Sequence, residues 1–337
     1  MRRYGKHTDE DDIRTRPNRK GNRPRTNIRP KHEDAADGMV LTVDRGRLTC
    51  LVEDRIVMAM KARELGRKAA VVGDTVALVG DLSGKRDTLA RIVRIADRSS
   101  VLRRTADDDD PYERVVVANA DQLAIVTALA DPEPRPRLID RCLVAAYDGG
   151  LEPLLVLTKS DLASPDKLLE LYGDLDIPFV VTSREELEQG AAADRVRAHL
   201  DGKVTAFVGH SGVGKTTLVN ALVPEDRRRT TGHVNAVTGR GRHTTTSALA
   251  LPLADSDGGW VVDTPGIRSF GLAHIDPTRV IHAFPDLEAG TEGCPRACSH
   301  DEQDCALDQW VADGHADPAR LYSLRRLLST RERREGD

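Results

Sequence analysis

A glycine-rich segment in the second half of the chain has the residue types of a phosphate-binding loop. It fits the pattern G-x-x-x-x-G-K-[ST] and lies between an apolar strand and an expected helix. Its residues are Gly209, His210, Ser211, Gly212, Val213, Gly214, Lys215, Thr216 and Thr217. Backbone N–H groups of such a loop surround phosphates, Lys215 adds positive charge beside them, and the Thr216 hydroxyl can ligate Mg²⁺. The segment predicts a nucleoside triphosphate site.

Two short segments that precede this loop indicate the base. The first, Thr158-Lys159-Ser160-Asp161, follows an apolar strand and resembles the N/T-K-x-D element of GTPases, whose carboxylate accepts two hydrogen bonds from guanine. Adenine does not offer that pair of donors. The second, Thr182-Ser183, fits the short loop that closes over the base. GTP and GDP are therefore the predicted ligands, and the alternative is an ATP-using enzyme that acts on a small molecule.

Two segments that follow the loop have groups suited to Mg²⁺ and the γ-phosphate. The sequence Asp263-Thr264-Pro265-Gly266 resembles the D-x-x-G element, in which Asp263 would reach Mg²⁺ through water and the Gly266 N–H would meet the γ-phosphate. A simple turn is the alternative. The Gly- and Thr-rich stretch 239–246 is of the type that a γ-phosphate orders as a switch, and Thr244 or Thr245 would supply a second hydroxyl to the metal.

The order of these motifs is circularly permuted. A conventional small GTPase begins with the phosphate loop and ends with the N-K-x-D element and the base loop, whereas here both of these precede the phosphate loop. The sheet can still close, because a permutation only moves the ends of the chain. The second switch, residues 263–270, consequently leads directly into the C-terminal segment.

Three of the five cysteines lie within twelve residues of one another, together with a histidine. Cys294, Cys298, His300 and Cys305 supply the ligand set of a closed tetrahedral Cys3His zinc site, and the absence of an open coordination position indicates one structural Zn²⁺. The alternative is a coincidental group of surface thiols. Cys50 and Cys142 lie in apolar runs and are expected to be core residues.

The pattern of strands and helices predicts three folded regions after a basic arm at 1–38. Residues 39–106 contain short strands at 40–43, 47–52, 56–59, 74–78 and 89–95, which predict an RNA-binding barrel of the OB type or an SH3-like barrel. Residues 107–270 alternate strands (122–128, 153–158, 178–182, 204–209, 260–263) with helices (138–147, 165–172, 184–200, 215–222), which predicts an α/β domain with a mostly parallel sheet. Residues 271–337 are expected to form a helical zinc-knuckle domain that ends in an arginine-rich helix at 318–334.

The composition excludes several classes of protein. The chain has 337 residues, a formal net charge of −4 and 3% aromatic residues, and no apolar run reaches the 18 residues of a membrane span. Its N-terminus lacks the apolar stretch of a signal peptide. A cytoplasmic, monomeric protein without a membrane partner is expected.

Positive charge is gathered in a few segments. Residues 1–38 carry eleven Arg or Lys against seven Asp or Glu, and prolines at 17, 24 and 30 prevent a continuous helix. This arm is expected to be disordered when free, and serves either solubility or contact with RNA phosphates. The run Arg227-Arg228-Arg229, then Arg240 and Arg242, and the closing helix are further candidates for phosphate contacts.

The barrel, the permuted motif order and the Cys3His knuckle together resemble the ribosome-small-subunit-dependent GTPase A family. The resemblance covers nearly all of the chain from Met39 onward, with Thr158 where the family usually has Asn. It implies a GTP hydrolase stimulated by the small (30S) ribosomal subunit. It further implies a late-stage maturation factor that binds 16S rRNA near the decoding region and is released on hydrolysis.

The catalytic residues cannot be those of a Ras-type enzyme. Ile267 occupies the position where Ras-type proteins have the glutamine that orients the attacking water. His243, beside the switch threonines, resembles the family's catalytic histidine, and Lys215 and Gly266 complete the predicted catalytic set. Two alternatives remain: His243 is only a mobile loop residue, or the protein is a nucleotide-gated RNA-binding scaffold with negligible hydrolysis.

Overall fold

The computed structural model describes residues 32–44, 46–66, 69–104, 114–228, 248–265, 277–302 and 304–329. The helices and strands below belong to the unit formed by residues 34–337, and residues 1–33 form a separate unit. Several predictions fall outside the described residues. They concern the basic arm up to residue 31, the arginines Arg229, Arg240 and Arg242, the switch residues His243, Thr244 and Thr245, then Gly266 and Ile267, and the end of the closing helix at 330–334.

Five strands near the N-terminus form a closed barrel. They are β1 (Ala36–Asp44), β2 (Arg47–Val52), β3 (Arg55–Lys61), β4 (Thr75–Gly80) and β5 (Ala90–Ile95). The order β1-β2-β3-β5-β4 closes through a β1–β4 pairing, and β3 and β5 pair in parallel. This order is that of an OB barrel, so the structure decides between the two predicted barrels. Position 38 of β1 needs glycine, because a Cβ there would lie 2.6 Å from the carbonyl oxygen of Leu51 on β2.

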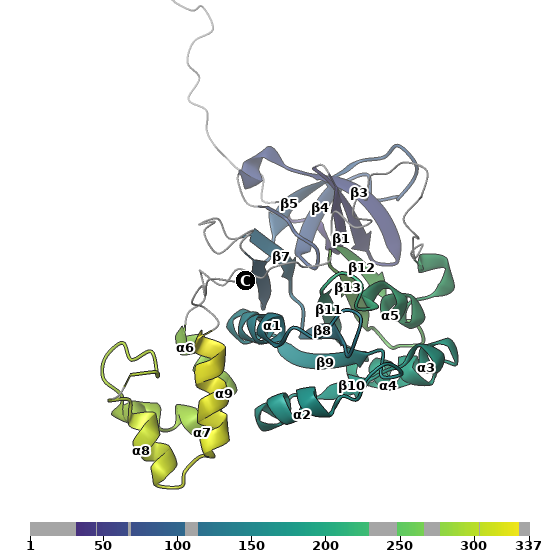
Figure 1. Ribbon diagram of the computed structural model, residues 1–337. Coiled ribbons are helices and arrows are strands. Elements are labelled where there is room, and N and C mark those ends of the chain that lie inside the picture. The colour runs from purple at the N-terminus through teal and green to yellow at the C-terminus, as the bar shows by residue number, and fades with distance from the viewer. Residues whose placement is uncertain are drawn as a thin grey trace, which may run out of the picture. The chain divides into compact units, whose positions relative to one another are not determined.

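The same sheet continues into the α/β region (Figure 1). Its strands are β8 (Gln122–Ala128), β9 (Glu152–Thr158), β10 (Phe179–Val181), β11 (Val204–Gly209), β12 (Leu249–Pro252) and β13 (Trp260–Asp263). They run in the order β10-β9-β8-β11-β13-β12, and all neighbours are parallel except β12 and β13. The predicted mostly parallel sheet is therefore confirmed. Every residue of β8 is buried, as expected of a strand covered on both faces.

Helices cover both faces of this sheet. They are α1 (Pro136–Gly149), α2 (Asp166–Tyr172), α3 (Arg184–Glu188), α4 (Ala191–Leu200) and α5 (Lys215–Leu222). Residues of α1 and α2 share one apolar core with Leu123 and Ile125 of β8, while residues of α4 and α5 share another with Ala124 and Val126. The prediction of one helix over 184–200 was wrong, because Gly190, with φ +89°, separates α3 from α4.

The C-terminal region is helical, as predicted. It contains α6 (Pro277–Val280), α7 (Pro285–Glu288), α8 (Ala306–Ala312) and α9 (Pro318–Ser329). The hairpin of β6 (Val101–Arg104) and β7 (Arg114–Ala118) and the strand β12 were not predicted. None of the helices in the described part of the chain combines the length and apolar character needed to cross a bilayer.

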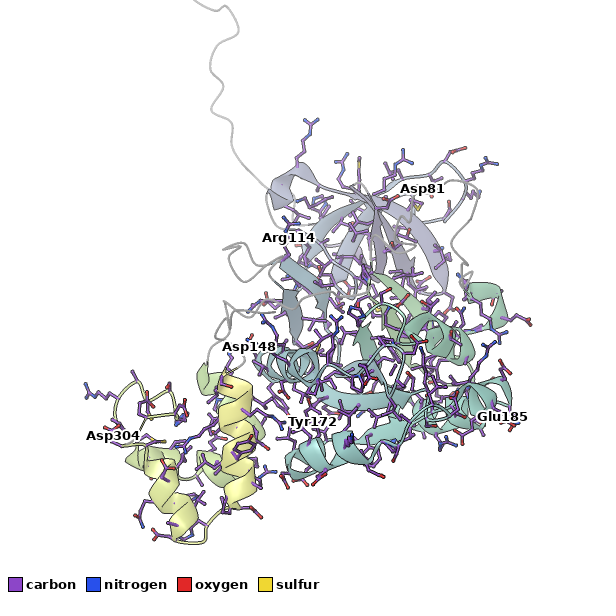
Figure 2. All side chains as sticks on the ribbon, in the orientation of Figure 1. Asp81, Arg114, Asp148, Tyr172, Glu185 and Asp304 are labelled. Carbon is purple, nitrogen blue, oxygen red and sulfur yellow. The ribbon has the colours of Figure 1, made fainter. Side chains whose placement is uncertain are left out.

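Three arginines of α9 make contacts inside the protein. Arg325 donates two hydrogen bonds to the Asp308 carboxylate on α8 at 2.7 and 2.8 Å, and Arg320 donates to the Asp286 carboxylate at 2.6 Å. The Arg326 guanidinium donates to the carbonyl of Leu171, and its carbon Cζ lies 5.0 Å from the ring centre of Tyr172, which is labelled in Figure 2. These side chains hold α9 against its neighbours, so they are poor candidates for the phosphate contacts predicted for this helix.

Candidate nucleotide site and metal centre

The predicted phosphate loop joins β11 to α5. Gly209 ends the strand, where a Cβ would lie 2.5 Å from the carbonyl oxygen of Val126 on β8. Gly212 and Gly214 have φ angles of +85° and +90°, in the left-handed region that favours glycine. Lys215 then begins α5, with Thr216 half-buried and Thr217 exposed in the first turn. The two glycines allow the tight turn between strand and helix that a phosphate loop requires.

The ends of β11 and β13 bring Lys215 and Asp263 together. The two strands are parallel neighbours, and the Lys215 ammonium donates to the Asp263 carboxylate and to the carbonyl of Thr264. Both side chains are buried, and the Thr264 hydroxyl donates to the carbonyl of Phe207 at 2.7 Å. The residue predicted to contact phosphates and the carboxylate predicted to reach Mg²⁺ therefore share one site.

The two predicted guanine-recognition segments are also neighbours. The Ser160 N–H donates to the Thr182 carbonyl at 3.2 Å, so the 158–161 loop is bonded to the base loop. Thr182 is buried, whereas Asp161 is exposed and free to accept hydrogen bonds from a base. Ser183 caps the N-terminus of α3.

The loop after β8 was not singled out from the sequence, although it contacts two of the motifs. Its Asp131 carbonyl accepts a hydrogen bond from the Lys159 ammonium. A Cβ at Gly212 would lie 3.8 Å from Pro132, and Pro132 also lines a cavity of about 20 Å³ with His210 of the phosphate loop. Prolines at 132, 134 and 136, directly after a buried strand, were the available signal.

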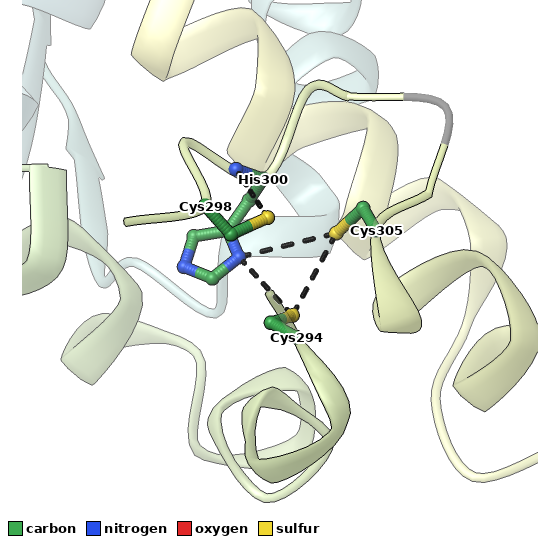
Figure 3. Close-up of side chains that lie close together, drawn as sticks. All are labelled: Cys294, Cys298, His300 and Cys305. Atoms are coloured by element: carbon green, nitrogen blue, oxygen red, sulfur yellow. Dashed lines mark hydrogen bonds between the residues drawn. The ribbon is translucent and has the colours of Figure 1, made fainter. Parts of the chain in front are cut away.

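The four predicted zinc ligands lie close together in the C-terminal region (Figure 3). Cys294 Sγ is 3.8 Å from His300 Nδ1 and 3.9 Å from Cys305 Sγ, and Cys305 Sγ is 3.9 Å from His300 Nδ1. All four ligand atoms, Cys298 Sγ included, lie within 4.8 Å of one another. Tetrahedral zinc with Zn–S bonds of about 2.3 Å separates neighbouring sulfur atoms by about 3.8 Å. The donor set and its spacing therefore fit Zn²⁺.

Backbone hydrogen bonds hold the loop that carries these four residues. Burial lowers the pKa of His300, which favours the neutral imidazole that a metal requires. The Cys298 sulfur also accepts the His300 N–H at 3.3 Å. Arg325 of α9 donates to the His300 carbonyl at 2.8 Å. The loop is thus bonded to α9 as well as to its own ligand atoms.

A family model described as RsgA GTPase matches residues 95–273. The chain belongs to the RsgA GTPase family. The matched range includes the guanine-recognition segments, the phosphate loop and the Asp263 segment, so the resemblance identified from the motifs is confirmed.

The relatives of this RsgA-family chain bear the same family name. "Small ribosomal subunit biogenesis GTPase RsgA" of Pseudomonas aeruginosa (strain LESB58) is 43% identical over 223 residues, which cover 64% of this chain and 64% of the relative. The protein of that name from Gemmatimonas aurantiaca is 36% identical over 270 residues, covering 80% of this chain and 86% of the relative. The chain thus spans 64% of the length of the Pseudomonas aeruginosa relative and 63% of that of the Pseudomonas putida relative.

Solved structures support the RsgA-type fold. YjeQ from Thermotoga maritima is 27% identical, with a TM-score of 0.62 over 89% of this chain and 100% of that protein. YloQ, described as a circularly permuted GTPase, is 21% identical, with a TM-score of 0.60 over 90% of this chain and 98% of that protein. The predicted fold class, an OB-like barrel with a permuted GTPase domain and a helical region, is therefore confirmed, and the helical region contains a Cys3His cluster that fits zinc.

Thr158, the first residue of the guanine-recognition segment, supports the phosphate loop. Its hydroxyl lies 2.6 Å from the carbonyl oxygen of Val213 and 3.3 Å from that of Thr127, and the residue is buried. A hydroxyl has only one hydrogen to donate, so the shorter contact to Val213 is the stronger bond. The Thr158 hydroxyl therefore links the guanine-recognition segment to the phosphate loop.

Replacement of Thr158 by Val should weaken GDP binding about tenfold, because a buried carbonyl left without its donor costs about 1–3 kcal/mol. Valine has nearly the shape of threonine, so the change removes little besides the hydroxyl. Equilibrium titration with GDP measures the effect, and Thr158→Ser, which keeps the hydroxyl, is the control. An unchanged dissociation constant for Thr158→Val would show that the Val213 contact contributes nothing to binding.

Proposed function

We propose that this protein hydrolyses GTP to GDP and phosphate and acts in biogenesis of the small ribosomal subunit. The observation that carries the proposal is a set of three contacts that join four separate motifs. Thr158 bonds to the phosphate loop, Ser160 bonds to the base loop, and Lys215 bonds to Asp263. Membership of the RsgA GTPase family is the second observation that supports GTP hydrolysis.

Each motif has a proposed role in the reaction. Asp161 accepts hydrogen bonds from guanine, with Thr182 and Ser183 over the base, and the loop from Gly209 to Thr216 binds the phosphates. Mg²⁺, when bound, neutralises charge on the β- and γ-phosphates. Thr216, Asp263 and either Thr244 or Thr245 would hold it, while Lys215 and the Gly266 N–H stabilise the charge of the transferring phosphate. Cys294, Cys298, His300 and Cys305 hold one Zn²⁺ with a structural role.

The proposed partner is the small (30S) ribosomal subunit, bound through 16S rRNA near the decoding region, with release on hydrolysis late in maturation. The OB-like barrel is a fold that binds oligonucleotides. The α9 arginines are paired with other elements of the protein, whereas Arg227 and Arg228 are exposed and pair with the nearby Asp226 and Glu225. The basic arm at 1–38 and these two arginines are therefore the stronger candidates for RNA phosphates. We propose domain limits of 39–106, 107–270 and 271–337, and a monomeric, cytoplasmic protein.

The proposal is tested by GTP and ATP turnover with and without isolated small subunits. We expect hydrolysis of GTP alone, stimulated by the subunit. Turnover of ATP with no response to the subunit would favour a small-molecule enzyme. Tight GTP binding without stimulated turnover would favour the nucleotide-gated scaffold.

Replacement of His243 by Ala should reduce subunit-stimulated GTP turnover about a hundredfold or more, since a general base contributes about 10²–10⁴ to a rate. The reason is that the aliphatic Ile267 cannot orient the attacking water, whereas the His243 imidazole can accept its hydrogen bond. Single-turnover rates with saturating subunits measure the effect. His282→Ala, which alters an exposed histidine in the C-terminal region, is the control. Undiminished stimulation in His243→Ala would remove His243 from the mechanism.

A further inference from the structure

The base loop, Thr182-Ser183, is short and depends on contacts made by neighbouring elements. It connects the three-residue edge strand β10 to the five-residue helix α3. β10 pairs only with β9 among the described strands, so one side of this strand has no neighbouring strand to hold it. Whatever holds the two ends of the loop therefore determines where it stands relative to a bound base.

Arg195 of α4 bonds to both sides of this loop. One nitrogen of its guanidinium, Nη2, donates to the carbonyl of Val181 at 3.1 Å, directly before the loop. The same nitrogen donates to the carboxylate of Glu186 at 2.9 Å, three residues after Ser183. The guanidinium thus connects the end of β10 to the first turn of α3.

Glu186 extends this connection to the loop itself. Its carboxylate accepts the N–H of Ser183 at 3.3 Å, and its own N–H donates to the Ser183 hydroxyl at 3.2 Å, which completes a capping box. The hydrogen bond from Arg195 lowers the pKa of Glu186, so the carboxylate is ionised at neutral pH. The Glu186 carboxylate therefore accepts hydrogen bonds both from the Ser183 N–H of the capping box and from Arg195.

The position of this loop bears directly on the guanine-recognition segment. The Thr182 N–H donates to the carbonyl of Leu157 at 2.7 Å, and the Thr182 carbonyl accepts the Ser160 N–H at 3.2 Å. Ser160 directly precedes Asp161, the proposed guanine ligand. A shift of the Thr182-Ser183 loop would consequently move the backbone beside Asp161 as well.

We propose that Arg195 is a positioning residue for guanine recognition, which holds the base loop in place through Val181 and Glu186. The inference rests on the proposed function and adds to it a residue that does not itself touch the nucleotide. The phosphate loop belongs to β11 and α5, which the Arg195 contacts do not reach. Arg195 therefore acts on binding of the base and leaves binding of the phosphates unchanged.

Replacement of Arg195 by Ala should raise the dissociation constant of GDP about three- to tenfold, chiefly through faster release. The effect is modest because the Arg195 and Glu186 side chains are 46% and 41% exposed, where solvent and salt weaken an ion pair. Arg195→Lys, which can bond to one of the two acceptors at a time, should fall between Ala and the unaltered protein. Release of a fluorescent GDP analogue and equilibrium titration measure these values in the full chain.

Inorganic pyrophosphate provides the readout that separates positioning from general damage. It occupies a phosphate loop but has no base, so its affinity should be the same for Arg195→Ala and the unaltered protein. Arg197→Ala is the matched control, because Arg197 lies on the same helix and pairs with Asp194. It should bind GDP and pyrophosphate like the unaltered protein.

Binding of GDP, ADP and pyrophosphate distinguishes failure of the Arg195 role from failure of the proposed function. If the unaltered protein binds pyrophosphate but has no preference for GDP over ADP, the proposed function itself fails. If it prefers GDP and Arg195→Ala binds GDP equally tightly, the role of Arg195 is overturned while the proposed function stands. If GDP and pyrophosphate weaken together, Arg195 is a general structural residue and the inference is again overturned.

Discussion

Asp161→Asn should reduce the affinity for GTP at least a hundredfold and create affinity for xanthosine triphosphate. The carboxylate is proposed to accept two hydrogen bonds from guanine, and each bond to a charged group contributes about 1.5–3 kcal/mol. Two such bonds correspond to a factor of about 10² or more in binding. Xanthine has a carbonyl where guanine has an amino group, so an amide N–H of Asn can donate where the carboxylate accepted.

The structure explains why this variant should keep its fold. Asp161 is exposed, and the backbone around it is held by bonds that do not use its carboxylate. Lys159 has a φ of +60° and donates to the carbonyl of Asp131, and Ser160 is bonded to Thr182. Removal of one negative charge from an exposed side chain leaves these contacts in place.

Competition titrations with GTP, ATP and xanthosine triphosphate test the exchange of base preference. Asp166→Asn is the matched control, because Asp166 lies in the first turn of α2, a few residues further along the chain. The control should keep its preference for GTP. If Asp161→Asn keeps that preference too, the guanine assignment of the 158–161 segment is wrong.

Cys305→Ser should abolish binding of one equivalent of zinc and unfold the knuckle together with the start of α8. Structural zinc contributes on the order of 10 kcal/mol to small metal-binding folds, far more than any one hydrogen bond. Cys305 is buried, supplies one of the four ligand atoms and directly precedes α8. A serine hydroxyl is a poor zinc ligand, so the remaining three residues would not hold the metal.

Zinc content of the purified protein and limited proteolysis of the C-terminal region measure the loss. Asp304→Asn, which alters the adjacent residue labelled in Figure 2, should retain zinc and resist proteolysis. GDP affinity should change little in either variant, because the knuckle residues have no bond to the phosphate loop among the described contacts. A zinc-free protein whose C-terminal region resists proteolysis would show that the cluster has no structural metal.

The elements that were predicted correctly have a strong local pattern. β8 is buried throughout and mostly apolar, every second residue of β2 is buried, and α5 follows directly from the phosphate-loop motif. The elements that were missed form through pairing over long distances in the chain. β12 has only four residues and ends in a proline, and it becomes a strand because β13 and β1 lie on either side of it.

Charge was the least reliable guide to surface contacts. The arginines of α9 resemble a solvent-exposed cationic face in the sequence, yet Arg320 and Arg325 pair with Asp286 and Asp308. A run of charges has the same local pattern whether it faces water or another helix. Only the packing of α9 against its neighbours separates the two cases.

The amino-acid sequence by itself determined the motifs, their order along the chain and the residues of the Cys3His cluster, because each motif is made of residues that are close together in the chain. The tertiary structure decided how these motifs support one another. Thr158 and Val213 are 55 residues apart in the chain, and Lys215 and Asp263 are 48 apart, yet the parallel sheet brings each pair into contact. The bonds from Arg195 to Val181 and Glu186 depend equally on how α4 packs beside β10. Such contacts follow from strand order and helix packing, which no short stretch of sequence specifies.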